Sequence, residues 1–281
     1  MRIRGMTAVA GVIALAFAAA GCSSSSSGGG PVKPTYVCKL SGKGKTLKVG
    51  IDTDQPGLGY QDSQEIHGLD ADIARCVAGE LGYGSVDFVP TNAPDREKVL
   101  ENGTVQMVAA TFSMTAAREQ QVSFAGPYFV TGQAVMVRTE SPIKGVQDLA
   151  GKKVCSVTGT TSVDNLLAKQ PKLVPEKYNS FTRCALDLAD GKVDAMTTDE
   201  AILAGYSAQQ QYAGKFKIVG STFSVEKYGL GLKHGDPACQ QTAKALQKVI
   251  DDGTWKKIVK NNLGNFAYDK SQNPPKKVSC V

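Results

Sequence analysis

The alternation of short β-rich runs with helix-like segments constrains the fold of this chain more than any other feature of its sequence. Amphipathic periodicity predicts helices at residues 70–81, 95–101 and 200–209, and two more near the carboxyl end, opened by Asp236-Pro237 and by Gly253-Thr254. Such alternation is typical of α/β architecture with largely parallel sheets. The predicted strands are residues 47–51, 86–89, 105–110, 153–157, 194–198 and 216–219.

A weak internal repeat predicts two similar α/β halves. Residues 100–111 (LENGTVQMVAAT) align with residues 188–199 (LADGKVDAMTTD), and each copy reads as a helix end, a glycine and a buried strand. This pattern forms one βαβ crossover, although it is generic enough to recur by chance. The two strands end at Thr111 and Asp199. Because ligands bind outside the carboxyl ends of strands in open parallel sheets, we expect these ends to face each other across a cleft.

The amino terminus predicts a lipoprotein signal peptide over residues 1–21. Arg2 and Arg4 precede an uncharged apolar run that ends in Ala-Ala-Gly before Cys22. Cys22 is therefore predicted to carry the lipid, and two acyl chains anchor a protein stably. An ordinary signal-peptidase site beside an incidental cysteine is the alternative. The Ser- and Gly-rich residues 22–35 predict a flexible tether, so the mature chain is expected outside the cytoplasm, lipid-anchored to the bacterial cell membrane.

The charge of the mature chain argues against a nucleic-acid partner. Removing residues 1–21 takes away Arg2 and Arg4 and no acidic residue, so the formal net charge falls from +6 to +4. The remaining Lys and Arg residues are scattered among Asp and Glu, without the basic stripe that nucleic-acid binding requires.

Six cysteines remain besides Cys22, an even number in a chain that leaves the reducing cytosol. Three disulfides are therefore expected, but six cysteines allow 15 pairings. A zinc site is the rival interpretation. The spacings contain no C-x-x-C, and His67 and His234 stand alone, so we expect neither a metal nor a cofactor.

Seven short motifs occur in an order that resembles the polar amino-acid-binding family of ABC importers. Each motif is weak alone, but the ordered set is specific and covers nearly all of residues 47–264. The chain looks most similar to the actinobacterial glutamate-binding lipoprotein branch, through residues 54–59 (DQPGLG). The motifs are residues 47–51 (LKVGI), 68–73 (GLDADI), 113–118 (SMTAAR), 124–128 (FAGPY), 159–161 (GTT), 193–195 (VDA) with Asp199, and 252–255 (DGTW).

The resemblance implies a two-lobed periplasmic-binding-protein-like α/β fold, in which two mainly parallel sheets are joined by two crossing strands. Lobe 1 would comprise residues 36–130 and 227–281, and lobe 2 residues 131–226. No disulfide would then cross the hinge. With these boundaries the implied disulfides are Cys155–Cys184, Cys239–Cys280 and Cys38–Cys76.

The resemblance also implies which residues hold the two charges of an amino acid. Arg118 occupies the family position for the α-carboxylate, which a guanidinium can meet with two parallel hydrogen bonds. Thr111 and Ser113 would add hydroxyl donors beside it. Asp199 stands where the family uses a carboxylate for the α-ammonium group. Thr161 would contribute from lobe 2, at a helix start whose residues could cap the helix, hold an anion at its amino end, or do both.

Four positions that follow the first strand need separate interpretation. Gln55 stands where the family usually stacks an aromatic ring on the ligand, and Tyr60 is either a replacement for that ring or ordinary core. Asp70 and Asp72, at a helix start after glycine, resemble a metal pair but are expected to cap the helix.

Two charged positions bear on which side chain fits. The acidic-ligand branch has an arginine where Arg96 lies, available to a distal carboxylate, but it commonly has a basic residue where this chain has Asp52. If Asp52 faces the pocket, it repels a ligand carboxylate but accepts from an amide, so glutamine or asparagine is the expected ligand. If Asp52 points outward, glutamate remains the expected ligand. The predicted order of ligands is glutamate, then glutamine, aspartate and asparagine.

We therefore expect a monomeric binding protein that hands a free amino acid to the permease subunits of an ABC importer. A sensor that reports ligand occupancy to a membrane receptor or kinase is the alternative. An extracytoplasmic dehydratase on the same fold is a third possibility. The sequence contains no nucleophile and base pair, so an enzyme is not expected.

Overall fold

The computed structural model describes residues 38, 40, 42–63 and 65–281. The predicted signal peptide at residues 1–21, the lipidation at Cys22 and the tether at residues 22–35 lie outside the described residues. Among the helices of the described part, none combines the length and the apolar character that crossing a membrane needs.

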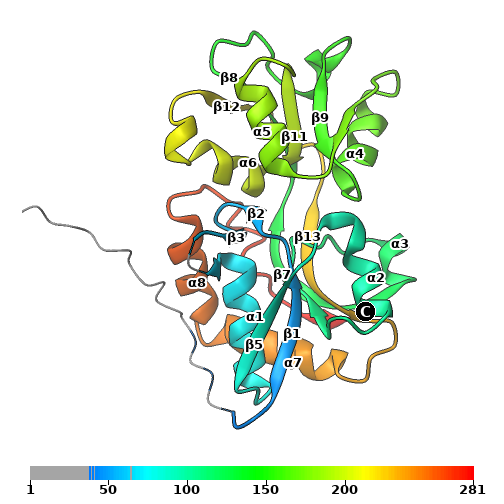
Figure 1. The fold of residues 1–281 in the computed structure, drawn as a ribbon, viewed down its shortest axis with the longest axis vertical. Helices are drawn as coiled ribbons and strands as arrows, with labels where there is room; N and C mark the ends of the chain where they lie inside the picture. The colour runs from blue at the N-terminus through cyan, green and yellow to red at the C-terminus, as the bar shows by residue number, and fades with distance from the viewer. Residues whose placement is uncertain (1–37, 39, 41, 64) are drawn as a thin grey trace, which may run out of the picture. The chain divides into compact units, whose positions relative to one another are not determined.

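A six-stranded sheet forms the base of the first lobe, in the order β14-β7-β13-β6-β1-β5. Strands β5, β1 and β6 are parallel, and β13, β7 and β14 run antiparallel to their neighbours. The strands are β1 (Thr46–Ile51), β5 (Ser85–Pro90), β6 (Met107–Val108), β7 (Val122–Thr131), β13 (Glu226–Lys233) and β14 (Ser279–Cys280). The helices of this lobe are α1 (Leu69–Glu80), α2 (Arg96–Glu101), α3 (Ala116–Glu119), α7 (Cys239–Asp251) and α8 (Thr254–Leu263) (Figure 1).

A five-stranded sheet forms the second lobe, in the order β10-β9-β11-β8-β12, with the first three strands parallel. Its strands are β8 (Gln133–Arg138), β9 (Val154–Val157), β10 (Glu176–Tyr178), β11 (Ala195–Asp199) and β12 (Phe216–Val219), and its helices are α4 (Thr161–Lys169), α5 (Phe181–Ala189) and α6 (Glu200–Ser207). A small third sheet consists of β2 (Asp54–Gln55), β3 (Gly59–Gln61) and β4 (Ile66–His67).

Strands β7 and β13 connect the two lobes. They pair antiparallel from Glu226 with Thr131 to Lys233 with Val122, and Figure 1 shows them side by side between the two groups of elements. The structure thus has the predicted two-lobed α/β fold with two crossing strands. The sheets are mixed rather than mainly parallel, because the crossing strands and the strands that follow them return antiparallel.

The internal repeat has a common structural basis in both lobes. Helices α2 and α5 each end shortly before a glycine, Gly103 or Gly191, and both glycines have a φ of 74°. Glycine adopts this left-handed conformation at little cost, which lets the chain turn from the helix into the next strand. The first strand is shorter than predicted, since β6 pairs only over Met107 and Val108 before the chain turns away toward Thr111.

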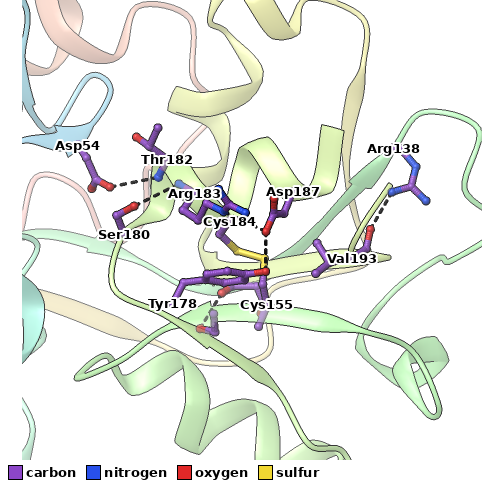
Figure 2. The surroundings of a disulfide bond; sticks show 12 residues. Asp54, Arg138, Cys155, Tyr178, Ser180, Thr182, Arg183, Cys184, Asp187 and Val193 are labelled. Carbon is purple, nitrogen blue, oxygen red and sulfur yellow. Dashed lines mark hydrogen bonds and ion pairs between the residues drawn. A yellow bond between two sulfur atoms is a disulfide. The ribbon is translucent and has the colours of Figure 1, made fainter. Parts of the chain in front are cut away.

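The three disulfides that the resemblance implied are all present. Cys38–Cys76 ties the start of the described chain to α1, Cys239–Cys280 joins α7 to β14, and Cys155–Cys184 joins β9 to α5. Figure 2 shows the last pair beneath Asp187, which accepts hydrogen bonds from Tyr178 Oη at 2.7 Å and Arg183 Nε at 3.1 Å. Because each disulfide lies within one lobe, none ties the two lobes together.

Candidate functional site

A small polar cavity lies where the strand ends of the two lobes meet. Its volume is about 10 Å³, roughly the space of one water molecule, so the two lobes are packed closely around it. Seven of the nine predicted ligand-binding residues line it; Asp52 and Tyr60 do not. The lining residues are Gln55, Ala93, Arg96, Thr111, Ser113 and Arg118 from the first lobe, and Thr160, Thr161, Ser162, Phe181, Thr198, Asp199 and Ile202 from the second.

Two guanidinium groups of the first lobe converge on one carbonyl oxygen of the second. Arg96 Nη2 and Arg118 Nη2 donate to the oxygen of Gly159 at 3.0 and 2.9 Å. The ring of Phe112 lies under both, 4.4 Å from Arg96 Cζ and 5.0 Å from Arg118 Cζ. Cation–π attraction therefore helps to hold two like charges side by side. The Gly159 carbonyl of the second lobe thus accepts hydrogen bonds from both cations of the first lobe.

Arg96 is a buried cation whose partners are backbone carbonyl groups. Its side chain is 3% exposed and donates to the oxygens of Ala93 and Ala110, each at 3.0 Å. Among the described residues it forms no ion pair. Burial, followed by the nearby Arg118 charge, lowers the pKa of Arg96 to about 10, so it stays charged at neutral pH. An uncompensated buried charge favours an acceptor or an anion in the cavity.

Arg118 belongs to α3 but reaches back into the cavity. Its Nη1 donates to the oxygen of Ser113 at 2.9 Å, and its Nε lies 3.4 Å from a carboxylate oxygen of Glu97. Thr115 begins α3 as its N-cap, because its hydroxyl accepts from the backbone N–H of Arg118 at 3.3 Å. The turn between Ser113 and the first turn of α3 therefore places the guanidinium beside Ser113.

Asp199 supplies a buried carboxylate on the wall from the second lobe. It ends β11, is 5% exposed, and accepts a hydrogen bond from Tyr228 Oη at 2.6 Å. Burial, followed by the negative charge of Glu226, raises the pKa of Asp199 to about 7. The cavity thus has guanidinium groups on one wall and a carboxylate that gains a proton easily on the other.

The backbone at Thr111 is held in a strained conformation by a buried carboxylate. Thr111 has a φ of 44°, which β-branched residues rarely adopt. Its N–H donates to Asp70 Oδ2 at 2.9 Å, and Tyr128 Oη donates to the other oxygen of Asp70 at 2.8 Å. The expected capping by Asp70 is therefore wrong: Gly68 is the N-cap of α1, and Asp70 holds the strand end that lines the cavity. Asp72 accepts from Asn262 Nδ2 at 2.8 Å instead of capping.

The amino end of α4 faces the cavity without a side-chain cap. Thr160 is the N-cap residue, but its hydroxyl donates to the oxygen of Val157 at 2.7 Å. Side-chain capping, one of the two roles expected for this helix start, is therefore not found in the described residues, and anion binding there stays a prediction. The hydroxyl of Thr161 donates to Glu226 Oε2 at 2.9 Å, which ties α4 to the start of β13.

Asp52 lies behind the cavity wall and holds Gln55. The carboxylate is 6% exposed and accepts from Gln55 Nε2 and from the backbone N–H of Asp54, both at 3.1 Å. Burial, followed by the charge of Asp54, raises the pKa of Asp52. Gln55 is 1% exposed, lines the cavity, and its Oε1 has no hydrogen-bond partner in the described part of the chain. Asp52 therefore influences the cavity through Gln55.

The aromatic ring of the cavity comes from a residue that the sequence did not single out. Tyr60 makes an edge contact with His67, 5.6 Å between ring centroids, away from the cavity lining. Phe181 lines the cavity from the first turn of α5, which begins after the capping side chain of Ser180. That cap signal could locate the start of α5, but not the direction of the ring. The sequence also missed Ala93, Thr160, Ser162, Thr198 and Ile202.

A second, larger groove of about 470 Å³ runs between α6 and α8. None of its lining residues is charged, so it does not offer partners for a charged small molecule. Its lining residues are Pro56, Gly57, Ala201, Ala204, Gly205, Ala208, Gln209, Asn262, Leu263, Asn265 and Phe266.

Direct contacts hold the lobes together beside this groove. The Asp54 carboxylate accepts from the backbone N–H of Thr182 at 3.1 Å (Figure 2), and the Asp54 carbonyl accepts from Tyr206 Oη. A Cβ on Gly205 would lie 2.1 Å from the oxygen of Pro56, so α6 approaches the first lobe as closely as only glycine allows. The described arrangement is therefore one in which the lobes touch.

The chain has extensive similarity to proteins of known class. Residues 47–265 match the bacterial extracellular solute-binding proteins, family 3. The glutamate-binding protein GluB of Corynebacterium glutamicum is 34% identical, over 99% of this chain and 95% of that protein. The ABC transporter glutamine-binding protein GlnH of Bacillus subtilis is 32% identical, over 86% of this chain and 90% of that protein. An ancestral arginine-binding protein bound to glutamine superposes with a TM-score of 0.73 at 35% identity, covering 78% of this chain and 98% of that one.

Proposed function

Because the chain belongs to the bacterial extracellular solute-binding proteins of family 3, we propose that it captures a free polar amino acid between its lobes and delivers it to an ABC importer. The observation that carries this proposal is the charge pattern of the cavity. Two guanidinium groups stand on one wall and the buried carboxylate of Asp199 on the other. The relatives named above are solute-binding proteins and not enzymes, and a binding role needs no catalytic group.

A free amino acid matches this charge pattern because it is a zwitterion. Its α-carboxylate would meet Arg118, with the hydroxyl of Ser113 and the uncapped amino end of α4 beside it. Its α-ammonium group would donate to Asp199 and to oxygen atoms near Thr111. The cavity contacts both lobes, so a ligand there favours the closed arrangement by its differential affinity.

The side chain of the ligand would meet the polar groups that remain, Arg96 and Gln55. Both are nearly fully buried, so an apolar side chain would leave them without partners. The proposed ligands are therefore glutamate, glutamine, aspartate and asparagine. The names of GluB and GlnH, a glutamate-binding and a glutamine-binding protein, support this set.

The lobe boundaries, the lipid anchor and the oligomeric state are part of the proposal. Lobe 1 at residues 36–130 and 227–281 and lobe 2 at residues 131–226 agree with the two sheets, whose strands cross these boundaries only at the ends of β7 and β13. The family is extracellular, which supports the predicted export. Anchoring through Cys22 and function as a monomer remain predictions from the sequence.

The experiment that tests the proposed function is ligand identification followed by titration. The mature protein is purified, denatured, and the released small molecules are identified by mass spectrometry; the refolded protein is then titrated calorimetrically with the twenty common amino acids. We expect one-to-one binding of one or more of the four proposed ligands. Preference for a cationic or large apolar amino acid would contradict the proposed class, and binding of no amino acid would contradict the function.

Ligand affinity is expected to fall as the pH drops below about 7. Burial raises the pKa of Asp199 to about 7, and the ligand ammonium group needs the ionised carboxylate. Affinity is therefore fully present above pH 7 and is lost by about tenfold per pH unit below it. Calorimetric titrations between pH 5 and pH 8 measure this slope.

Asp199→Asn is the matched control for this pH dependence. It should bind more weakly at pH 8 and show a flatter profile, because the titrating group is gone. The free energy of unfolding measured without ligand should instead rise as the pH falls from 7 to 4. The raised carboxyl pKa makes the folded state bind more protons than the unfolded state in this range. A pH profile that is equally steep in Asp199→Asn would assign the effect to another group.

A further inference from the structure

The amide group of Gln55 is oriented by its contact with Asp52. The amide nitrogen of Gln55 faces Asp52, because Nε2 donates to Asp52 Oδ2 at 3.1 Å. The other carboxylate oxygen is occupied by the N–H of Asp54. The amide oxygen of Gln55 is thereby turned away from Asp52.

The amide oxygen of Gln55 is a buried acceptor without a partner. Gln55 is 1% exposed and lines the cavity, and its Oε1 has no hydrogen bond in the described part of the chain. Buried polar groups normally have partners, so such an atom at a binding cavity indicates a donor supplied by the ligand.

Arg96 presents the opposite kind of group to the same cavity. Its guanidinium only donates, is 3% exposed, and has backbone carbonyls as its partners. A ligand side chain that reaches both residues must accept from Arg96 and donate to Gln55.

We infer that Asp52 and Gln55 select a ligand whose side chain ends in a carboxamide, so that glutamine and asparagine bind more tightly than glutamate and aspartate. This inference rests on the proposed function and reverses its predicted order of ligands. Asp52 is a positioning residue, since it contacts Gln55 and does not line the cavity.

Each of the other classes of ligand side chain leaves Arg96 or Gln55 facing a group of its own kind. A ligand carboxylate suits Arg96 but presents only acceptors to Gln55 Oε1. A cationic side chain suits Gln55 but faces the buried cation Arg96. A carboxamide presents a C=O to the arginine and an NH₂ to the glutamine, and is neutral. Rejecting an analogue that leaves a buried polar group unpaired is a strong source of selectivity.

The test compares affinities for glutamine and glutamate in the wild type, Asp52→Asn and Gln55→Met. All are titrated calorimetrically at pH 8, above the pKa of Asp199. The two ligands share their α-groups, so the ratio of their dissociation constants cancels effects on folding or lobe closure. We expect the wild type to favour glutamine by at least about tenfold.

Both variants should reduce this ratio by about tenfold, for different reasons. In Asp52→Asn a neutral amide accepts or donates, so Gln55 can turn its nitrogen toward a carboxylate. In Gln55→Met the acceptor is gone while the Asp52 carboxyl group remains, which separates the hydrogen bond to Gln55 from any direct effect of Asp52 on the ligand. Glutamate bound more tightly than glutamine by the wild type, or an unchanged ratio in Gln55→Met, would overturn the inference and leave the proposed function intact. Failure to bind any amino acid would overturn the proposed function itself.

Discussion

Replacing Arg118 with methionine is expected to weaken binding of every amino acid ligand by about two to three orders of magnitude. In the proposed complex the guanidinium meets the α-carboxylate, which all amino acids share. Removing one partner of a buried ion pair leaves the other charge uncompensated, at a cost of about 3–5 kcal/mol. Isothermal titration calorimetry with the ligand identified by mass spectrometry measures the loss.

Two further variants make the Arg118 result specific. Arg118→Lys keeps the charge but loses the planar fork, so it should still bind at least about tenfold more weakly. Arg183→Met removes an arginine of the second lobe whose side chain is 54% exposed and pairs with Asp187, outside the cavity. Its affinity should stay within about twofold of the wild type. Near-native affinity in a folded Arg118→Met protein would refute the assignment of the α-carboxylate.

The elements of this fold could be predicted because they follow local patterns. Strand β12 agrees with the prediction residue for residue, and α1 and α6 differ by one or two residues at their ends. The glycines of the repeat, Gly103 and Gly191, predicted the turns into the strands that end at the cavity. These features depend on neighbours in the sequence, which is why one sequence suffices to find them.

The details of the cavity depend on which way side chains point, and local patterns do not encode that. Asp70 has the sequence context of a capping residue, yet it holds Thr111, 41 residues away in the chain. Phe181 supplies the aromatic wall of the cavity, whereas the sequence offered Tyr60 as the replacement ring. The direction of Asp52 was left open by the sequence, and the structure resolves it through contacts with Gln55 and the backbone of Asp54.

Closure of the lobes depends on small residues as well as on polar contacts. Gly205 on α6 meets Pro56 of the first lobe, and Gly159, before α4, meets Pro94, where an added Cβ would lie 2.6 Å from Cα. Asp54 adds hydrogen bonds to Thr182 and Tyr206. The contacts of Gly205 and Asp54 lie outside the ionic part of the cavity, so they allow lobe closure to be tested separately from ligand chemistry.

Substituting Gly205 with alanine is expected to weaken ligand binding by about tenfold to a hundredfold while slightly stabilising the ligand-free protein. The new Cβ would lie 2.1 Å from the oxygen of Pro56, so the lobes must stay about 1 Å further apart. A ligand then cannot contact both walls well, and its apparent affinity falls with the population of the closed state. Within α6 the same change favours the helix by up to about 1 kcal/mol, because alanine has the higher helix propensity.

Calorimetry, thermal unfolding and small-angle scattering together test this separation of closure from stability. Gly145→Ala is the matched control, since it lies in the second lobe and its Cβ would meet only Gly220 Cα at an ordinary 3.5 Å. Gly205→Ala should show weaker binding, an unchanged or higher melting temperature without ligand, and less compaction at saturating ligand than either the wild type or the control. Full affinity and full compaction in Gly205→Ala would mean that the ligand-bound lobes do not form the contact between Gly205 and Pro56. A Cβ atom 2.1 Å from a backbone oxygen can be relieved only by moving the two backbone segments, and therefore the lobes, apart.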